Sequence, residues 1–318
     1  MKEIKCLIDK FSKDKFERIS TLHTKWMKKF CEFILKHIKE DRIKGRIEYV
    51  HDNIVEYVVE VGTTLPRTRD GRDFSCPMPN LQGVFIVQDI TTKLEEDGKT
   101  YAKISPAIAV LYNKLERPDT FIHEMAHAFS STMKYLVEEG QIYKNGVEYS
   151  VRDCETFKKK SGDWINEGLT EALAGIFFDE NIEELKKDFD LSPSFSTKKP
   201  EYHASYDSYI PMKIMLRDMS NELLVNAYFG DKEDLQKFAE HFNEVMKDEQ
   251  IDFKEFNKYD NQDEGAHPHE LLYLACKYVL NMCTTQEEKD KEIERMKGLL
   301  TYNWTPSFEQ ALLGGVTV

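Results

Sequence analysis

Two histidines and a glutamate occur together in the segment His123-Glu124-Met125-Ala126-His127, which is an H-E-x-x-H pattern. If this segment is helical, the histidines lie four residues apart and therefore one turn above the other on one face. Two imidazoles in that arrangement can bind one zinc ion, and a glutamate beside them can take a proton from a zinc-bound water. The pattern indicates zinc-dependent hydrolysis, and it requires a third ligand from elsewhere in the chain.

Residues 118–133 around this pattern have the periodicity of an amphipathic helix. Its apolar stripe, with spacings of three and four residues, is formed by Ile122, Met125, Ala126, Phe129 and Met133. Asp119 or Thr120 is expected to cap the start of the helix by accepting from backbone N–H groups that have no partner within it. The two histidines then lie on a different face from the stripe.

A second helix, predicted to begin at Asp163, supplies two candidates for the third ligand. Glu167 and Glu171 are four residues apart, so both lie on one face of this helix. One carboxylate can bind zinc while the other accepts the ring N–H of a zinc-bound histidine and fixes its tautomer. Periodicity alone allows either assignment; we expect Glu167 to be the ligand and Glu171 to support it.

The composition of the 318 residues sets broad limits on the class of protein. A hydrophobic content of 41% is sufficient for a folded core, and a net charge of −13 argues against general nucleic-acid or membrane binding. The six cysteines include no C-x-x-C pair, so we expect reduced thiols. No signal peptide or transmembrane segment is evident, which makes the cytoplasm the expected location, although export without a cleaved signal is also compatible.

The elements expected around the two helices predict an α+β fold. Residues 1–45 are expected to form an N-terminal helical segment that ends at Gly45. Residues 46–230 are expected to form the catalytic core, with a small mixed sheet beside the motif helix and a mostly helical lower subdomain after it. Residues 231–318 are expected to form a C-terminal helical segment packed on the core.

Several local patterns locate the strands of this sheet. Residues 46–50 are predicted to be a strand, and residues 54–61 are compatible with a strand or a buried helix. Residues 84–87 and 101–104 flank an Asp-Gly turn and predict a β-hairpin, and Asn145-Gly146 predicts a second turn. Further helices are predicted over residues 205–219, 221–228, 232–246, 268–282 and 286–300.

The two motifs together resemble the gluzincins, zinc peptidases in which a glutamate on a second helix completes an H-E-x-x-H site. The run Trp164-Ile165-Asn166-Glu167-Gly168 is similar to the W-x-N-E-G segment of the aminopeptidase branch, whose glutamate binds zinc. In the thermolysin-like branch an acidic residue four positions later orients a zinc histidine, which is the place of Glu171. The resemblance therefore implies a thermolysin-like catalytic core with zinc held by His123, His127 and Glu167.

The same resemblance implies a mechanism and a substrate class. Glu124 would act as the general base, and the oxyanion would be stabilised by a Tyr or His from the following helices, where His203, Tyr206 and Tyr209 are candidates and the tyrosines are preferred. An edge strand would bind the backbone of a peptide or protein substrate, a part that residues 101–109 can play. The aminopeptidase segment G-x-M-E-N, which holds the substrate's free amine, is absent, so an endopeptidase is favoured.

Three alternatives are compatible with the same residues. The H-E-x-x-H pattern can arise by chance on an amphipathic helix, or the protein can be a binding or scaffold module whose zinc is structural or absent. Hydrolysis of a non-peptide bond is the third. Glu124 is not needed to hold a metal, which argues against a purely structural site. Other histidines, including His23 and His267-Pro268-His269, are interpreted as surface or interface residues rather than ligands.

Overall fold

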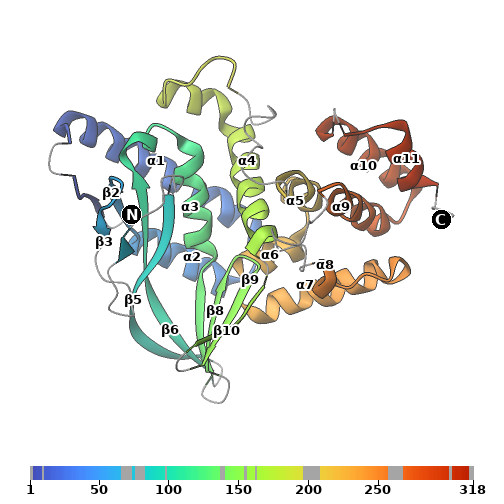
Figure 1. The fold of residues 1–318 in the computed structure, drawn as a ribbon, viewed down its shortest axis with the longest axis horizontal. Helices are drawn as coiled ribbons and strands as arrows, with labels where there is room; N and C mark the ends of the chain where they lie inside the picture. Colours follow the sequence, from blue (N-terminus) through green and yellow to red (C-terminus); the bar gives the residue numbers. More distant parts are fainter. Residues whose placement is uncertain are drawn as a thin grey trace.

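A mixed sheet with helices packed against it makes the fold α+β, as the sequence predicts. The structure is a computed structural model, and it describes residues 3–8, 11–65, 74–75, 83–96, 99–136, 140–153, 156–161, 163–195, 208–256, 268–300 and 303–314. Statements about the fold and the site refer to these residues. Figure 1 shows the sheet and the first helices at one end of the molecule and the C-terminal helices at the other.

The sheet has the strand order β1-β2-β6-β7-β8-β9-β10, and β5 pairs with β6 off this path. The strands are β1 (Glu3–Cys6), β2 (Val55–Val59), β5 (Gly83–Glu96), β6 (Lys99–Leu111), β7 (Thr132–Leu136), β8 (Gly140–Asn145), β9 (Glu148–Asp153) and β10 (Thr156–Ser161). The pairs β1–β2 and β2–β6 are parallel, and the other pairs are antiparallel. A separate two-stranded sheet contains β3 (Thr64–Leu65) and β4 (Phe74–Ser75).

The hairpin formed by β5 and β6 is longer than the sequence predicts, and it sets the edge of the sheet. One part of β6 pairs with β2 and another with β7, while β5 pairs along most of its length with β6. Within the described residues β6 is therefore paired on both sides near its two ends, and β5 is an outer strand. The predicted Asn145-Gly146 turn is confirmed, since it joins β8 to β9 with Gly146 at φ +56°, a conformation that favours glycine.

The helices account for most of the remaining chain. They are α1 (Lys13–His37), α2 (Asp41–Asn53), α3 (Pro118–Ser130), α4 (Asp163–Asp188), α5 (Tyr209–Leu216), α6 (Glu222–Phe229), α7 (Lys232–Val245), α8 (Phe253–Phe256), α9 (Pro268–Met282), α10 (Gln286–Leu299) and α11 (Pro306–Leu313). Two short 3-10 helices are η1 (Tyr112–Lys114) and η2 (Lys247–Glu249). The helices predicted over 221–228, 232–246, 268–282 and 286–300 are confirmed to within a few residues.

The predicted strand at residues 46–50 is wrong, because this segment belongs to α2. Ile43, Ile47 and Val50 follow one another at spacings of four and three, and all are buried, so the segment contributes one helical face to the core. Gly45, expected to stop the preceding helix, lies inside α2, and the expected domain boundary at residue 45 falls within that helix. The next segment is the strand β2, one of the two alternatives given for it.

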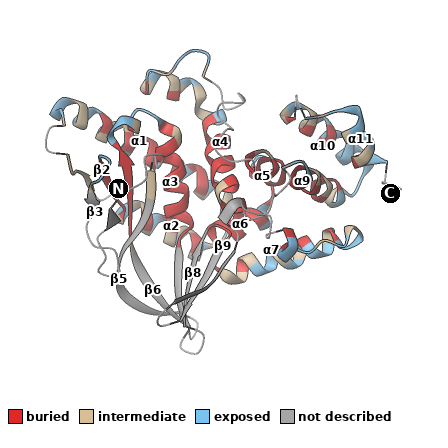
Figure 2. Ribbon diagram, viewed as in Figure 1, coloured by how far each residue is buried: buried red, intermediate tan, exposed pale blue. Residues whose placement is uncertain are grey.

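The motif helix α3 is buried along nearly its whole length. It begins at Pro118, with Arg117 as the N-cap and no capping side chain, so the expected cap by Asp119 or Thr120 is wrong. Residues from Thr120 to Ser130 are all buried, and Figure 2 shows this helix as the most continuously buried element near the sheet. The helix ends before Met133, which lies in β7, because the chain turns there into the sheet.

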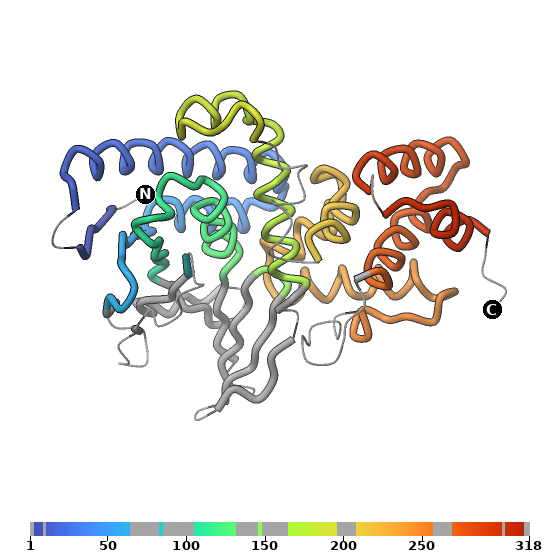
Figure 3. The backbone as a smooth tube through the Cα atoms, turned by 45° about the horizontal axis from the view of Figure 1, so that its top comes forward, coloured from blue at the N-terminus to red at the C-terminus, as the bar shows by residue number. Residues whose placement is uncertain are grey.

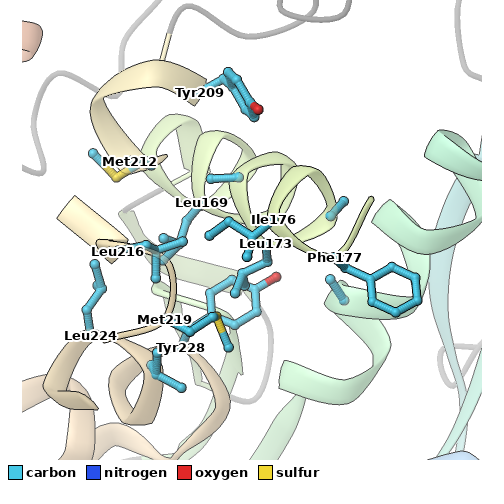
Figure 4. Packing of buried hydrophobic residues seen from close by; sticks show 14 of the residues in the cluster. Leu169, Leu173, Ile176, Phe177, Tyr209, Met212, Leu216, Met219, Leu224 and Tyr228 are labelled. Atoms are coloured by element: carbon cyan, nitrogen blue, oxygen red, sulfur yellow. The ribbon is translucent and has the colours of Figure 1, made fainter. Parts of the chain in front are cut away.

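The second helix α4 is confirmed, and it extends beyond the predicted range to Asp188. Its C-terminal half is crossed by α1, as Figure 3 shows, and charged side chains join the two helices. Lys25 pairs with Asp188, and Lys29 pairs with Glu184. On the other side, α5 packs against α4 and α9, and Figure 4 shows the buried side chains between α4, α5 and α6.

A buried polar pair ties α1 to the sheet and to the start of α3. His23 is fully buried, with Nδ1 2.7 Å from Glu56 Oε1 and Nε2 3.0 Å from the carbonyl oxygen of Leu115. Its ring stacks on Phe121 of α3 at a centroid distance of 4.0 Å. His23 is thus an interface residue, as expected, and it joins three elements that position the motif helix.

The other expectations of the sequence are met in part. The four cysteines that the structure describes, Cys6, Cys31, Cys276 and Cys283, are free thiols. His269 is exposed in the first turn of α9, as expected for a solvated helix start. None of the helices in the described part of the chain combines the length and hydropathy that crossing a bilayer requires.

Replacing His23 should destabilise the fold strongly. The variant His23→Leu leaves the Glu56 carboxylate buried without its partner, so we expect the free energy of unfolding to fall by about 3 kcal/mol. The double variant His23→Leu/Glu56→Leu removes both polar groups and should recover most of this loss. Urea unfolding followed by circular dichroism measures both, with His51→Ala on the surface as the control. Equal stability of His23→Leu and the wild type would contradict the role of the pair.

Candidate metal centre

Three side chains from α3 and α4 bring ligand atoms to one point. Nε2 of His123 lies 3.0 Å from Glu167 Oε2 and 3.1 Å from Nε2 of His127, and Nε2 of His127 lies 3.4 Å from Glu167 Oε1. These three residues form the one group of potential metal ligands found within the described residues. The structure therefore brings together the two motif histidines and the glutamate that the sequence selects.

The separations match the needs of a small tetrahedral ion. Ligand bonds of about 2.0 Å in tetrahedral geometry place neighbouring ligand atoms about 3.3 Å apart. The observed separations of 3.0 to 3.4 Å lie close to that value. Two imidazoles and one carboxylate also suit zinc and neighbouring first-row ions better than calcium or magnesium, which prefer oxygen ligands. The donor set and its spacing thus fit a small first-row transition-metal ion, of which zinc is one.

Glu171 supports this centre from the next turn of α4. Its Oε2 lies 2.8 Å from Nδ1 of His123, the nitrogen that faces away from the other two ligands. A histidine that donates from Nδ1 to a carboxylate presents the lone pair of Nε2 to a metal. Because Glu167 and Glu171 lie one turn apart, a single helix face provides both the ligand and the group that orients a second ligand.

The local sequence explains why these polar groups converge in the interior. The apolar positions of α3, which include Phe121, Ile122, Met125 and Phe129, are all buried and fix the rotation of the helix against its neighbours. The opposite face then directs His123 and His127 toward Glu167 and Glu171 of α4. Both histidines are only 7–8% exposed, so they must be paired or bound to an ion to be stable there.

The charged groups of the centre shift one another's pKa values so that the charged form of each is favoured. Burial alone would lower the pKa of His123, but hydrogen bonds to Glu167 and Glu171 outweigh it and raise that pKa well above 6.5. The pKa of His127 is also raised, because the charge of Glu167 outweighs burial. Conversely, the pKa of Glu167 is held well below its ordinary value by the two histidines, although burial opposes this. Without metal, protons on the imidazoles compensate the carboxylates.

Glu124, the candidate base, lies on α3, and its side chain faces the first residue of β5. It is 8% exposed, and its charge contributes to the raised pKa of His127, which places it near the ligands. The first residue of β5, Gly83, faces it closely: a Cβ atom there would come within 2.8 Å of Glu124 Cγ and 3.1 Å of Oε1. Glycine at position 83 therefore leaves the space that the Glu124 side chain occupies.

A buried hydrogen-bond network fixes the end of α3 and the start of α4. The hydroxyls of Ser130 and Ser131 both donate to the carbonyl oxygen of His127. Ser130 Oγ also accepts from the backbone N–H of Gly146, and Asn166 Oδ1 accepts from that of Val147. The β8–β9 turn is thereby attached to the residues that follow His127 and precede Glu167. The sequence indicated the turn but gave no sign of this attachment.

The structure describes only some of the residues that the sequence predicts to stabilise the oxyanion or to bind the substrate. Tyr206 and His203 lie outside the described residues. Tyr209 is fully buried, and its hydroxyl accepts from Lys213 at 3.2 Å and lies against Gly175 of α4. Its part in stabilising an oxyanion stays a prediction.

The expected substrate strand, residues 101–109, lies in β6, which pairs with β5 on one side and, on the other, with β7 at Thr100–Tyr101 and with β2 at residues 107–111. The outer strand next to α3 within the described residues is β5.

Comparison of the chain with known protein families, curated proteins and solved structures found no match. The activity of the centre must therefore be inferred from its own residues and their geometry.

Metal binding should depend on pH in a direction set by His123 and His127. A protonated imidazole cannot bind metal, and the raised pKa values extend the protonated form to pH values above 6.5. We expect zinc uptake near pH 7 to release protons, and the apparent affinity to rise with pH from about 6 to about 8. Titration calorimetry in buffers of different ionisation enthalpy measures the released protons.

The variant Glu171→Gln is the matched comparison for this prediction. It removes one of the carboxylates that raise the pKa of His123, so its affinity should reach a plateau at a lower pH than in the wild type. An affinity that is independent of pH in this range, with no proton release, would contradict the assignment of these imidazoles as ligands.

Proposed function

We propose that the protein is a zinc-dependent peptidase with a gluzincin-like catalytic core, and that it cleaves peptide bonds within a chain. The observation that carries this proposal is the convergence of His123, His127 and Glu167 at tetrahedral spacing with Glu124 on the same helix. Glu124 supports catalysis over a purely structural site, because it is buried beside the ligands although metal binding does not require it.

Each residue of the centre has a separate part in the proposed hydrolysis. Bound zinc would supply Lewis acidity, which lowers the pKa of a coordinated water and polarises a carbonyl group. Glu124 accepts the proton from the attacking water and returns it to the nitrogen of the leaving amine as the C–N bond breaks. Glu171 keeps the ring of His123 in one tautomer and orientation throughout. The reaction consumes one water and leaves a carboxylate and an amine.

The position of β5 supports a peptide as the substrate. This outer strand runs beside α3, and its first residue contacts the side chain of Glu124. Within the described residues the edge of β5 away from β6 pairs with no other strand, and such an edge can bind an extended peptide through backbone hydrogen bonds. A substrate bound to this edge would have its backbone next to the proposed base.

The sequence of β5 favours cleavage within a chain over removal of the first residue. An aminopeptidase needs a carboxylate near the metal to bind the free amine of its substrate. The first residues of β5, Gly83-Val84-Phe85-Ile86-Val87, include no acidic residue. This strand is the one next to Glu124, so the proposal is an endopeptidase.

Replacing the base should stop hydrolysis without loss of the metal. In Glu124→Gln the ligands are intact but the proton acceptor is absent, so we expect the rate to fall by about 10²- to 10⁴-fold. The measurement is cleavage of a diverse peptide library by the zinc-reconstituted full chain, with bound zinc determined by elemental analysis. Glu287→Gln on the exposed face of α10 is the control and should have wild-type activity.

Two outcomes of that experiment would contradict the proposal. Full activity of Glu124→Gln would show that this glutamate is not the base. A wild-type protein that takes up no zinc after metal-replete expression would instead favour a binding or scaffold module.

A methyl group at position 83 should impair the base indirectly. In Gly83→Ala the new Cβ would lie 2.8 Å from Glu124 Cγ, closer than real contacts allow, so the Glu124 side chain must move. We expect kcat/KM to fall by about tenfold while bound zinc is unchanged. Gly298→Ala on α10 is the control, since a Cβ there meets nothing within 4 Å. Equal activity of Gly83→Ala and the wild type would show that β5 does not constrain Glu124.

A further inference from the structure

A phenol from α6 reaches the two helices that carry the potential metal ligands. Tyr228 of α6 is fully buried, and Figure 4 shows it among the buried side chains that pack between α4 and α6. Its hydroxyl oxygen lies 2.7 Å from Oγ1 of Thr170, a residue of α4 between Glu167 and Glu171. A buried tyrosine hydroxyl usually finds a hydrogen-bond partner, because an unsatisfied polar group in the interior is costly. The contact therefore places a directional bond beside the turn of α4 that carries a ligand.

Thr170 connects this phenol to the residues that position Glu167. The Thr170 hydroxyl donates to the carbonyl oxygen of Asn166 at 2.8 Å, and Asn166 directly precedes Glu167 in α4. The side-chain oxygen of Asn166 in turn accepts from the backbone N–H of Val147 in the β8–β9 turn. Thr170 and Asn166 are both fully buried, where hydrogen bonds are stronger than in water. The turn of α4 from residue 166 to residue 170 is therefore held by side chains as well as by its own helical hydrogen bonds.

The same phenol lies against the residues that hold the end of α3. A Cβ atom at position 146 would come within 2.5 Å of Cε2 of Tyr228, so the ring packs directly on Gly146. The N–H of Gly146 donates to Oγ of Ser130 at 2.8 Å, and the Ser130 hydroxyl donates to the carbonyl oxygen of His127 at 3.0 Å. Burial raises the pKa of Tyr228, and hydrogen bonds with Thr170 and Ser130 oppose that rise. Tyr228 thus contacts both α4 and the last turn of α3.

The two turns that Tyr228 contacts carry ligands that face each other across the centre. Nε2 of His127 lies 3.4 Å from Oε1 of Glu167, the longest of the separations within the group of three potential ligands. This separation depends on the position of the last turn of α3 relative to the turn of α4 that begins at Asn166. A side chain in a functional site must be held to within about 0.5 Å of its productive position. A group that restrains both turns therefore controls the spacing of these ligands.

We propose that Tyr228 is a positioning residue of the metal centre, whose hydroxyl fixes the spacing between His127 and Glu167 by restraining the turns of α3 and α4 that carry them. This inference rests on the metal site of the proposed function but not on its hydrolytic step. Tyr228 acts through Thr170 and through the Ser130 network, and it is neither a ligand nor a catalytic residue.

The first test is the rate at which zinc leaves the full chain when a chelator is added in excess. Tyr228→Phe keeps the ring that packs on Gly146 and removes the hydroxyl that contacts Thr170. Outer partners of metal ligands change affinity by about 10- to 100-fold, and Tyr228 is one contact further out, so the variant should release zinc about fivefold to tenfold faster.

Tyr278→Phe is the matched control for this substitution. Tyr278 is also fully buried, and its hydroxyl accepts at 3.3 Å from Asn221, the N-cap residue of α6. The control therefore loses one buried hydrogen bond to the same helix, but at the end opposite to Tyr228. It should keep the wild-type release rate, because its hydroxyl contacts neither turn that carries a ligand.

Cobalt(II) in place of zinc reports the geometry of the centre separately from the stability of the fold. The visible absorption of bound cobalt(II) depends on the number and arrangement of its ligands. We expect the absorption bands to shift in Tyr228→Phe at saturating cobalt(II), because the spacing of His127 and Glu167 changes. Tyr278→Phe should have the wild-type spectrum.

Substitutions of Thr170 show whether the effect passes through the observed contact. Thr170→Val removes the hydroxyl and keeps the shape of the side chain, so it should accelerate zinc release as Tyr228→Phe does. Thr170→Ser retains the hydroxyl and should restore a release rate close to that of the wild type. In the double variant Thr170→Val/Tyr228→Phe the second substitution should add little, because both remove the same interaction.

The measurements separate this inference from the proposed function. From a wild type that binds zinc, a release rate of Tyr228→Phe equal to that of Tyr278→Phe would overturn the inference alone. An unchanged cobalt(II) spectrum, or fully additive effects of Tyr228→Phe and Thr170→Val, would also overturn it. A wild type that binds zinc but cleaves no peptide would overturn the proposed function alone, and a wild type that binds no zinc would overturn both. Faster release, a shifted spectrum and non-additive effects together support the inference.

Discussion

The pairing of His123 with Glu171 and Glu167 is the interaction on which the rest of the site depends. His123 and Glu171 are largely removed from water and Glu167 is partly so, and an unpaired charge on the buried groups would cost several kcal/mol. The pairing therefore acts together with the buried apolar face of α3 to fix the position of this helix relative to α4. Once α3 is fixed relative to α4, the positions of His127 and Glu124 are also fixed, because both residues belong to α3.

The packing around α3 and α4 maintains the relative position of these two helices. The buried pair of His23 and Glu56 holds the start of α3 against α1 and β2, and the hydroxyls of Ser130 and Ser131 hold its end against the β8–β9 turn. Both ends of α3 are thus attached by hydrogen bonds between buried groups, which are directional in a way that apolar contacts are not. A helix fixed at both ends in this way keeps the side chains of His123 and His127 in one position relative to α4.

The sequence predicts the parts of the site that depend on spacing within one helix. The assignments of His123, His127, Glu167 and Glu171 to common faces need only the period of 3.6 residues, and the structure places them as that period requires. Residues 46–50 form a helix although their β-branched and aromatic side chains favour a strand, because Ile43, Ile47 and Val50 share one buried helical face. The outer position of β5 and the place of Tyr209 depend on contacts between distant segments, which no local pattern records.

The charges of the centre explain why protons and a metal ion are alternatives there. Glu124, Glu167 and Glu171 bring three carboxylates close to two imidazoles, an excess of negative charge in a buried region. Without metal, the raised pKa values of the imidazoles reduce that excess by holding protons. A divalent cation reduces it equally while leaving both imidazoles neutral and able to donate their lone pairs. The arrangement of carboxylates that raises these pKa values is therefore the same arrangement that favours a cation.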